Sequence, residues 1–171
     1  EPDRQPVRHF GYAGFSSNVT LCNAFDHAGY WAARFYSDRT LFACDADGLP
    51  YDSIPLPDAD RLQLEVWDIA STPEGLVYLR TSGGLWQYFP DTRAFAYVPV
   101  ALPGGKGELR DGLGGILAAT DGSIWVTTRW GAFRSDGGGG AFLPVGQDSA
   151  NMDRWIPPGA SMIEQLDKDH L

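Results

Sequence analysis

Apolar and polar residues alternate along most of this chain in short runs that end at glycine or proline. The clearest example is 116–133, where an apolar run meets the turn Asp121-Gly122 and a second run follows over 123–128. Alternation with a period of two places apolar side chains on one face of a β-strand. Asp-Gly pairs favour tight hairpin turns, because both central residues there must tolerate positive φ. The pattern predicts a hairpin, with a third strand starting at Ala132.

The same order of residue types recurs at intervals of 47 positions. The matches are Ile69 with Ile116, Gly75 with Gly122, Tyr78 with Trp125, Thr81 with Thr128, Gly84 with Gly131 and Trp86 with Phe133. An earlier copy, which needs small insertions to align, contains Val19, Cys22 and Trp31, and a fourth copy begins at Ile163 and Leu166. Repeats of about 40 to 50 residues built from short strands are typical of β-propeller blades.

The repeat predicts an all-β fold, a partial β-propeller with three four-stranded antiparallel blades and the first strand of a fourth. We expect a lead-in over 1–15, blades over 16–57, 62–100 and 108–145, and the start of a truncated fourth blade over 160–171. Strands are expected near 19–24, 30–35, 40–44 and 52–56 in the first blade, with outer strands near 94–98 and 141–145 in the next two.

Three blades do not close a ring, because propellers contain about four to eight. We therefore expect this chain to be a fragment of a longer protein. The alternative is self-association, for example as a homodimer, which would cover the open sheet edges.

Composition excludes several classes of partner. The net charge of −9, from 13 Lys and Arg against 22 Asp and Glu, argues against a nucleic-acid partner. No stretch approaches the roughly 18 consecutive apolar residues of a membrane-spanning helix.

Cys22 and Cys44 fall on the first and third strands of their blade, which are about 10 Å apart. That separation exceeds the limit for a disulfide, so we expect two buried thiols.

The segments 74–88, EGLVYLRTSGGLWQY, and 121–133, DGSIWVTTRWGAF, carry the repeat most fully. They resemble the two-component regulator propeller repeat, found in the extracytoplasmic sensor regions of hybrid histidine kinases and related membrane-bound regulators. Residues 14–19 resemble the start of such a region. The resemblance implies a periplasmic or extracytoplasmic location, further blades in the parent chain, and a downstream histidine kinase or diguanylate cyclase domain. The chain departs from the pattern at the turn aspartate, where Thr72 and Ala119 stand.

In up-and-down blades, the loop before the first strand and the loop between strands two and three share one face. Loops on a rigid β scaffold commonly carry recognition residues. This face is expected to hold Asn18, Tyr36, Ser37, Asp38, Trp67, Asp68, Ser82, Arg110, Asp111, Arg129, Trp130, Arg154 and Trp155. The candidate ligand-binding residues among them are Tyr36, Asp38, Arg110, Asp111, Arg129, Trp130, Arg154 and Trp155. Aromatic rings beside Arg and Asp suit a carbohydrate or another polar small molecule.

Packing offers an alternative explanation for several of these residues. Trp31, Tyr78 and Trp125 belong to the repeat and are expected in the core, whereas Trp130 and Trp155 break it. Arg110 and Arg129 are equally consistent with ordinary solvated or ion-paired loop positions.

Nothing in the sequence points to catalysis, a metal or a cofactor in this segment. His9, His27 and His170 belong to no nucleophile motif, and most carboxylates occupy turn positions. A ligand-sensing module is therefore the preferred hypothesis. One alternative is a propeller enzyme of the polysaccharide lyase or glycosidase type, which needs clusters of acidic or histidine side chains facing the central channel. Another is a protein-binding scaffold propeller, which needs an exposed apolar patch.

Overall fold

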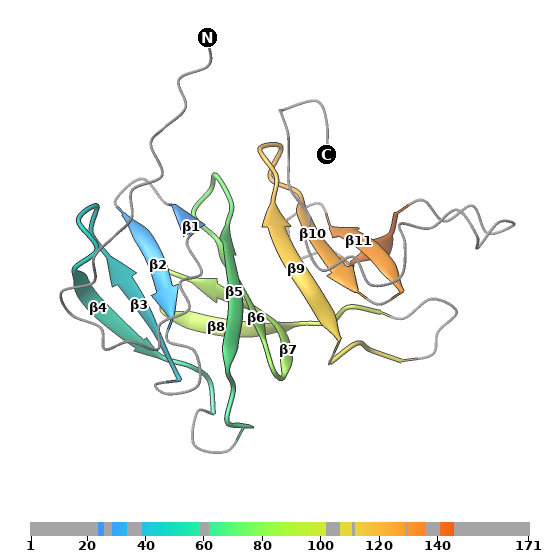
Figure 1. Cartoon of the computed structure of the whole chain (residues 1–171), viewed down its shortest axis with the longest axis horizontal. Helices are drawn as coiled ribbons and strands as arrows, with labels where there is room; N and C mark the ends of the chain where they lie inside the picture. The colour runs from blue at the N-terminus through green and yellow to red at the C-terminus, as the bar shows by residue number, and fades with distance from the viewer. Residues whose placement is uncertain are drawn as a thin grey trace, which may run out of the picture.

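A computed structural model describes residues 24–25, 29–33, 39–58, 62–101, 107–110, 112–128, 130–135 and 141–145. The elements they form are β-strands, and none of their segments is a helix that could cross a membrane. The strands make three four-stranded antiparallel sheets, each built from strands consecutive in sequence (Figure 1). The all-β prediction, with three four-stranded sheets of a partial propeller, is confirmed.

Each sheet runs in order from its first strand to its last. The first sheet contains β1 (Ala24–Phe25), β2 (Tyr30–Ala33), β3 (Thr40–Cys44) and β4 (Pro50–Pro55). The second contains β5 (Val66–Ser71), β6 (Val77–Thr81), β7 (Gly84–Phe89) and β8 (Ala94–Val98). The third contains β9 (Leu113–Ala118), β10 (Ile124–Thr128), β11 (Gly131–Ser135) and β12 (Leu143–Pro144).

The expected strands agree with these bounds to different degrees. Two of them, 40–44 and 94–98, have the bounds expected, and the strand expected over 52–56 begins two residues earlier. The strand expected over 141–145 is shorter, at Leu143–Pro144, and the one expected over 30–35 is described at Tyr30–Ala33, with 34–35 outside the described residues. The lead-in, the expected start of a fourth blade, and all of 19–24 except Ala24 lie outside the described residues.

The first strands of the three sheets lie together on the inside of the arrangement. β5 contacts both β1 and β9, and Figure 1 shows β5 between them, with β4 on the periphery. Successive sheets therefore pack face to face around a shared inner side, which is how propeller blades are arranged.

Two hydrophobic cores hold the sheets together. The first inter-sheet core, between the first and second sheets, consists of Trp31, Ala33, Leu41, Ala43, Ile54, Leu56, Leu64, Val66, Ile69, Val77, Leu79 and Tyr88. The second inter-sheet core, between the second and third sheets, consists of Ala70, Tyr78, Leu85, Val98, Val100, Leu109, Leu113, Ile116, Ile124, Val126, Phe133 and Phe142. Neighbouring residues of β6 enter different cores, because successive side chains of a strand point to opposite faces.

The threonine and glycine of the repeat close the turn between strands two and three. Thr81 Oγ1 donates to the Gly84 carbonyl at 2.9 Å and accepts from the Gly83 N–H at 3.1 Å. Thr128 makes the corresponding bonds to Gly131, at 3.0 Å, and to the Trp130 N–H, at 2.9 Å. Gly84 and Gly131 have φ of 109° and 117°, which favours glycine at both positions.

The hairpin predicted around Asp121-Gly122 is present, but its turn differs from the expected one. Ala118 and Ile124 form the last pair between β9 and β10, so five residues connect the strands. Gly122 has φ of 81°, whereas Asp121 does not have positive φ. Asp121 Oδ1 instead accepts from the Ser123 N–H at 2.9 Å. In the second sheet Thr72, which aligns with Ala119 and not with Asp121, accepts from the Leu76 N–H through Oγ1 at 3.3 Å.

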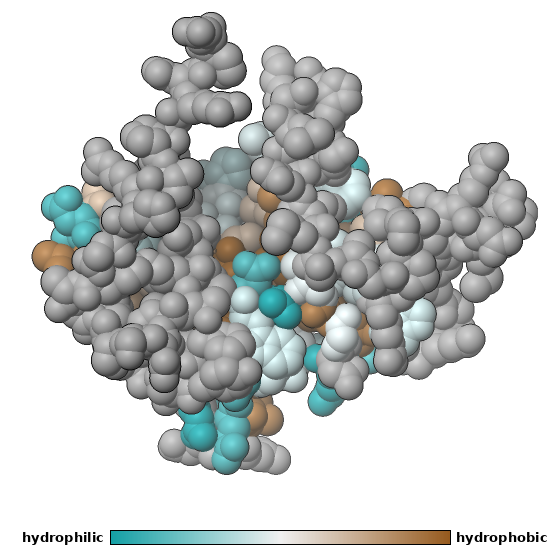
Figure 2. All heavy atoms as spheres, in the orientation of Figure 1, coloured by the Kyte–Doolittle hydropathy of each residue, from teal (hydrophilic) through white to brown (hydrophobic). Residues whose placement is uncertain are grey.

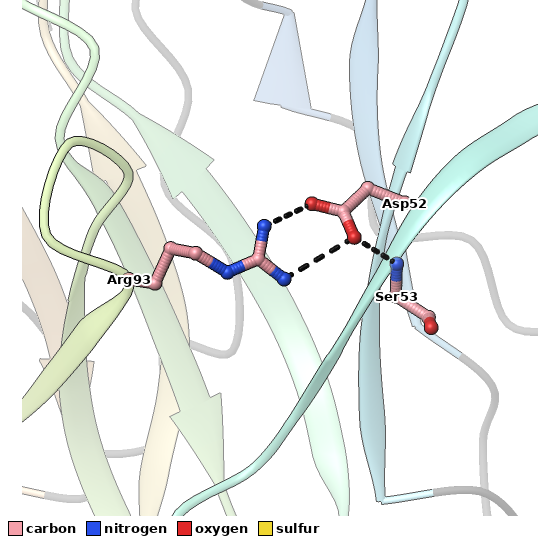
Figure 3. A network of polar contacts seen from close by, with 3 residues as sticks. All are labelled: Asp52, Ser53 and Arg93. Atoms are coloured by element: carbon pink, nitrogen blue, oxygen red, sulfur yellow. Dashed lines mark hydrogen bonds and ion pairs between the residues drawn. The ribbon is translucent and has the colours of Figure 1, made fainter.

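An ion pair joins the peripheries of the first two sheets (Figure 3). Arg93, in the turn between β7 and β8, donates from Nη1 to Asp52 Oδ2 at 2.5 Å and from Nη2 to Asp52 Oδ1 at 3.2 Å. Asp52, on β4, also accepts from the Ser53 N–H at 2.8 Å. The Arg93 bond, followed by the Ser53 bond, lowers the pKa of Asp52 below its ordinary value. Both side chains are solvent-exposed enough that salt screens the pair.

The thiol of Cys44 is buried and free, as expected for this residue. It lies with Tyr30 and Ala32 on the face of the first sheet that points away from the second. Burial is the main cause that raises the pKa of Cys44 to about 11, and Asp45 adds to it. Cys22 is outside the described residues.

Candidate functional site

Two of the eight candidate ligand-binding residues, Arg110 and Trp130, are among the described residues. The other candidates, Tyr36, Asp38, Asp111, Arg129, Arg154 and Trp155, lie outside them.

The loop before β5 and the turn between β6 and β7 meet at one end of the second sheet. There the Ser82 N–H donates to the Glu65 carbonyl, and the Glu65 N–H donates to Ser82 Oγ, both at 3.0 Å.

Arg110 contacts the second sheet. Its guanidinium carbon lies 5.7 Å from the centre of the Tyr97 ring, within the range of a cation–π interaction. The Tyr97 ring in turn meets Trp86 edge-on, with ring centres 5.6 Å apart. Burial and, to a smaller extent, Glu108 raise the pKa of Tyr97, while Arg110 opposes them. Arg110 therefore ties the loop before β9 to the outer strand of the second sheet.

Trp130 is half-buried and packs against the second inter-sheet core. Its counterpart 47 positions earlier is Gly83, where an added Cβ would lie 2.4 Å from Leu64 Cδ2. In the second sheet Leu64 thus fills the space beside a glycine, whereas the third sheet has a large side chain at the equivalent turn position. Packing accounts for this departure from the repeat.

A polar cluster lies at the inner strands, between the second and third sheets. We call it the inner cluster, and it consists of Glu65, Trp67, Asp68 and Arg80. β5 contains a bulge, because Val66 pairs with Thr81 and Asp68 with Arg80, which leaves Trp67 as the extra residue. A bulge bends its strand and changes the direction of a side chain, and bulges are frequent beside functional sites.

Arg80 links three parts of this region. Nη1 donates to the Leu113 carbonyl of β9 at 3.2 Å, and Nη2 donates to the Trp67 carbonyl at 3.3 Å. The guanidinium carbon lies 5.2 Å from the centre of the Trp67 ring. One side chain on β6 therefore holds the bulge of β5, stacks on its tryptophan and reaches the next sheet.

Asp68 forms a second link between the same two sheets. Oδ2 accepts from the Ile116 N–H of β9 at 3.1 Å, and Oδ1 accepts from the Ile69 N–H at 3.0 Å. Burial raises the pKa of Asp68 above its ordinary value, although these two bonds and the charge of Arg80 act in the opposite direction. The carboxylate is thus partly desolvated at a junction between sheets.

The third sheet repeats the bulge without the inner cluster. Ile116 pairs with Val126 and Leu113 with Thr128, so β9 is bulged at the matching position. Gly114, Gly115 and Thr127 occupy the places of Trp67, Asp68 and Arg80. Thr127 Oγ1 accepts from the Gly115 N–H at 2.7 Å, so a small side chain is enough to hold this bulge.

Sequence reasoning placed Trp67 and Asp68 near the ligand face but missed Arg80. The available signal was the repeat itself, because Arg80 stands where the next copy has Thr127. A charged residue in the second strand, at a position that faces a neighbouring blade, needs a specific partner. That partner could not be identified without the fold.

Neither a protein-family model nor a curated protein matches this chain. Its fold is similar to two solved structures of the extracellular domain of BT4673 from B. thetaiotaomicron, described in one as a one component system and in the other as a hybrid two component system. The likeness is one of fold. In the first, the TM-score is 0.51 at 20% identity, over 76% of this chain and 16% of that chain.

In the second, the TM-score is 0.51 at 21% identity, over 70% of this chain and 17% of that chain. This chain therefore spans about a sixth of the length of the solved chains it matches. Among the residues that the structure describes, no group of three or more His, Cys, Asp or Glu side chains could hold a metal ion.

Proposed function

We propose that this chain is part of the ligand-sensing region of a membrane-bound signal-transduction regulator, of the two-component sensor kinase or diguanylate cyclase type. It lies outside the cytoplasm and is not catalytic in this segment. The observation that carries the proposal is the fold similarity to the extracellular domain of BT4673, a protein described as a hybrid two component system. The propeller repeat in 74–88 and 121–133 supports it independently.

A sensing region must change its preferred arrangement when a ligand binds. A ligand shifts such an equilibrium only by the difference between its affinities for the two arrangements. The junction between β5 and β9 provides a place for this, because polar bonds from Asp68 and Arg80 to the third sheet accompany the apolar contacts there.

The proposal is tested by thermal unfolding of the full chain with a panel of neutral glycosides, sugar acids, amino acids and nucleosides. Ligand at about 100 times its dissociation constant stabilises a protein by about 2.7 kcal/mol. For a chain of this length that raises the melting temperature by several degrees. No shift with any compound would contradict the proposal, and release of reducing ends from a polysaccharide would favour the enzyme alternative.

A further inference from the structure

We propose that the indole of Trp67 is a stacking platform for a neutral sugar ring, with the Glu65 carboxylate as the acceptor for its hydroxyl groups. This inference rests on the proposed sensing function and names a site and a ligand class for it. The packing of the sheets does not explain the position of Trp67, which belongs to neither inter-sheet core.

Two of the other half-buried tryptophans of the described segments pack against a hydrophobic core. Trp86 packs against the first inter-sheet core and Trp130 against the second. Trp125 was expected in the core, but it is half-buried and belongs to neither core; its indole N–H donates to Ser123 Oγ and Arg134 lies over its ring. Trp67 belongs to neither core, and the matching bulge of the third sheet forms with Gly114 in its place. The bulge does not require an aromatic side chain.

The indole of Trp67 is held in one orientation. The Arg80 guanidinium carbon lies 5.2 Å from the centre of the ring, and the indole N–H donates to Glu65 Oε2 at 3.3 Å. Trp67 nevertheless remains partly exposed. Figure 2 shows hydrophilic and intermediate side chains gathered at the centre of the visible face, over β5 and toward β9. A pre-ordered aromatic ring loses little side-chain entropy when a ligand binds.

Charge favours a neutral ligand over an ionic one. An anion on the ring would lie beside the Glu65 carboxylate, while both terminal nitrogens of Arg80 donate to backbone carbonyls. A cation would be repelled by the Arg80 guanidinium on the same ring. A sugar places its C–H face on the aromatic ring and donates hydroxyl hydrogens to a carboxylate, which has about four acceptor positions.

The position of the platform couples it to the neighbouring sheet. Arg80, which supports the ring, also bonds to the Leu113 carbonyl, and Asp68, the next residue after Trp67, accepts from the Ile116 N–H. A ring stacked on Trp67 therefore contacts a side chain that is held by Arg80, one of the two residues that join β5 to β9.

The test uses saturation-transfer NMR on the full chain with methyl β-D-glucopyranoside, methyl β-D-galactopyranoside and methyl α-D-mannopyranoside at millimolar concentration. We expect transfer to the ring protons of at least one glycoside. The signal should be lost in Trp67→Ala and retained in Trp67→Phe. Trp125→Ala is the matched control, because that indole also donates to the residue two positions earlier and lies 5.6 Å from an arginine, Arg134.

Transfer that persists in Trp67→Ala, or that disappears equally in Trp125→Ala, would overturn the inference, as would the absence of transfer from all three glycosides. If Trp67→Ala does not fold, Glu65→Gln decides, with affinity expected to fall about fivefold because a charged acceptor becomes neutral. An unchanged affinity in Glu65→Gln would also overturn the inference. A non-sugar ligand found by the thermal panel would leave the sensing function standing while this inference fails.

Discussion

Single residues of the repeat have distinct structural tasks. Thr81 and Thr128 each bond to two backbone groups of the turn between the second and third strands of their sheet. Both hydroxyl groups are buried, so water cannot replace these bonds. The threonine of the repeat is therefore explained by turn closure, not by strand propensity.

Thr128→Val tests this task, because valine keeps the shape and removes the hydroxyl. The Gly131 carbonyl and the Trp130 N–H lose their partner, and each unsatisfied buried group costs about 1–3 kcal/mol. We expect the free energy of unfolding, measured by urea denaturation, to fall by about 2 kcal/mol. Thr92→Val, at an exposed turn position, should change it by less than about 0.5 kcal/mol. Equal effects of the two substitutions would contradict the turn-closing role.

At the scale of elements, the inner strands β5 and β9 share a bulge but fill it differently. The bulge of β9 contains glycine and is held by Thr127, while that of β5 contains Trp67 and is held by Arg80. The repeat thus supplies the backbone distortion, and differences at four equivalent positions create the inner cluster.

The pH dependence of stability tests the position of Asp68. Its raised pKa means that just above about pH 4 the folded state keeps a proton that the unfolded state has lost. The contribution of Asp68 to stability therefore declines as the pH rises through this window, whereas Asp68→Asn has no such dependence. We expect the stability of the natural sequence minus that of the variant to decrease between about pH 4 and about pH 7, measured by urea denaturation.

Asp91→Asn, at an exposed turn position, controls for the loss of one negative charge. The prediction is contradicted if the natural sequence becomes more stable relative to Asp68→Asn as the pH rises. That result would mean that the bonds from Ile69 and Ile116 stabilise the ionised Asp68 carboxylate more than burial destabilises it.

At the scale of the whole molecule, polar contacts join neighbouring sheets in two places, near the inner strands and at the periphery. Near the inner side, Asp68 and Arg80 connect the second sheet to the third, beside the second inter-sheet core. At the periphery, Asp52 and Arg93 connect the first sheet to the second. The peripheral ion pair is exposed to water, whereas the Asp68 carboxylate is partly desolvated, so salt and pH affect the two junctions differently.

Arg93→Gln separates the peripheral junction from the rest. Its hydrogen bond is the largest cause of the lowered pKa of Asp52, so we expect that pKa to rise in the variant, measured by carbon-13 NMR of the carboxyl group. Because the folded pKa lies below the unfolded one, the pair stabilises above the ordinary pKa and loses this effect as the pH falls. Arg134→Gln, which removes the pair with Asp121 in the third sheet, should leave the Asp52 titration unchanged. An unchanged Asp52 pKa in Arg93→Gln would show that the Ser53 N–H alone holds it low.

The sequence by itself determined the all-β class and the three consecutive four-stranded sheets. Period-two alternation and turn glycines act locally, so a recurrence over 47 residues was enough to locate most strands within two residues. The turn at Asp121-Gly122 was less predictable, because five residues connect the strands and only the glycine has positive φ.

Only the tertiary structure decided which polar and aromatic residues meet between sheets. Trp130, which was expected at a ligand face, is half-buried and packs against the second inter-sheet core. At the matching position of the second sheet, Gly83, the space is filled instead by Leu64. Arg80 and Leu113 are 33 positions apart and come together because their sheets stack. Local patterns specify strands, whereas contacts across stacked sheets depend on the register of both sheets, which no short stretch of sequence contains.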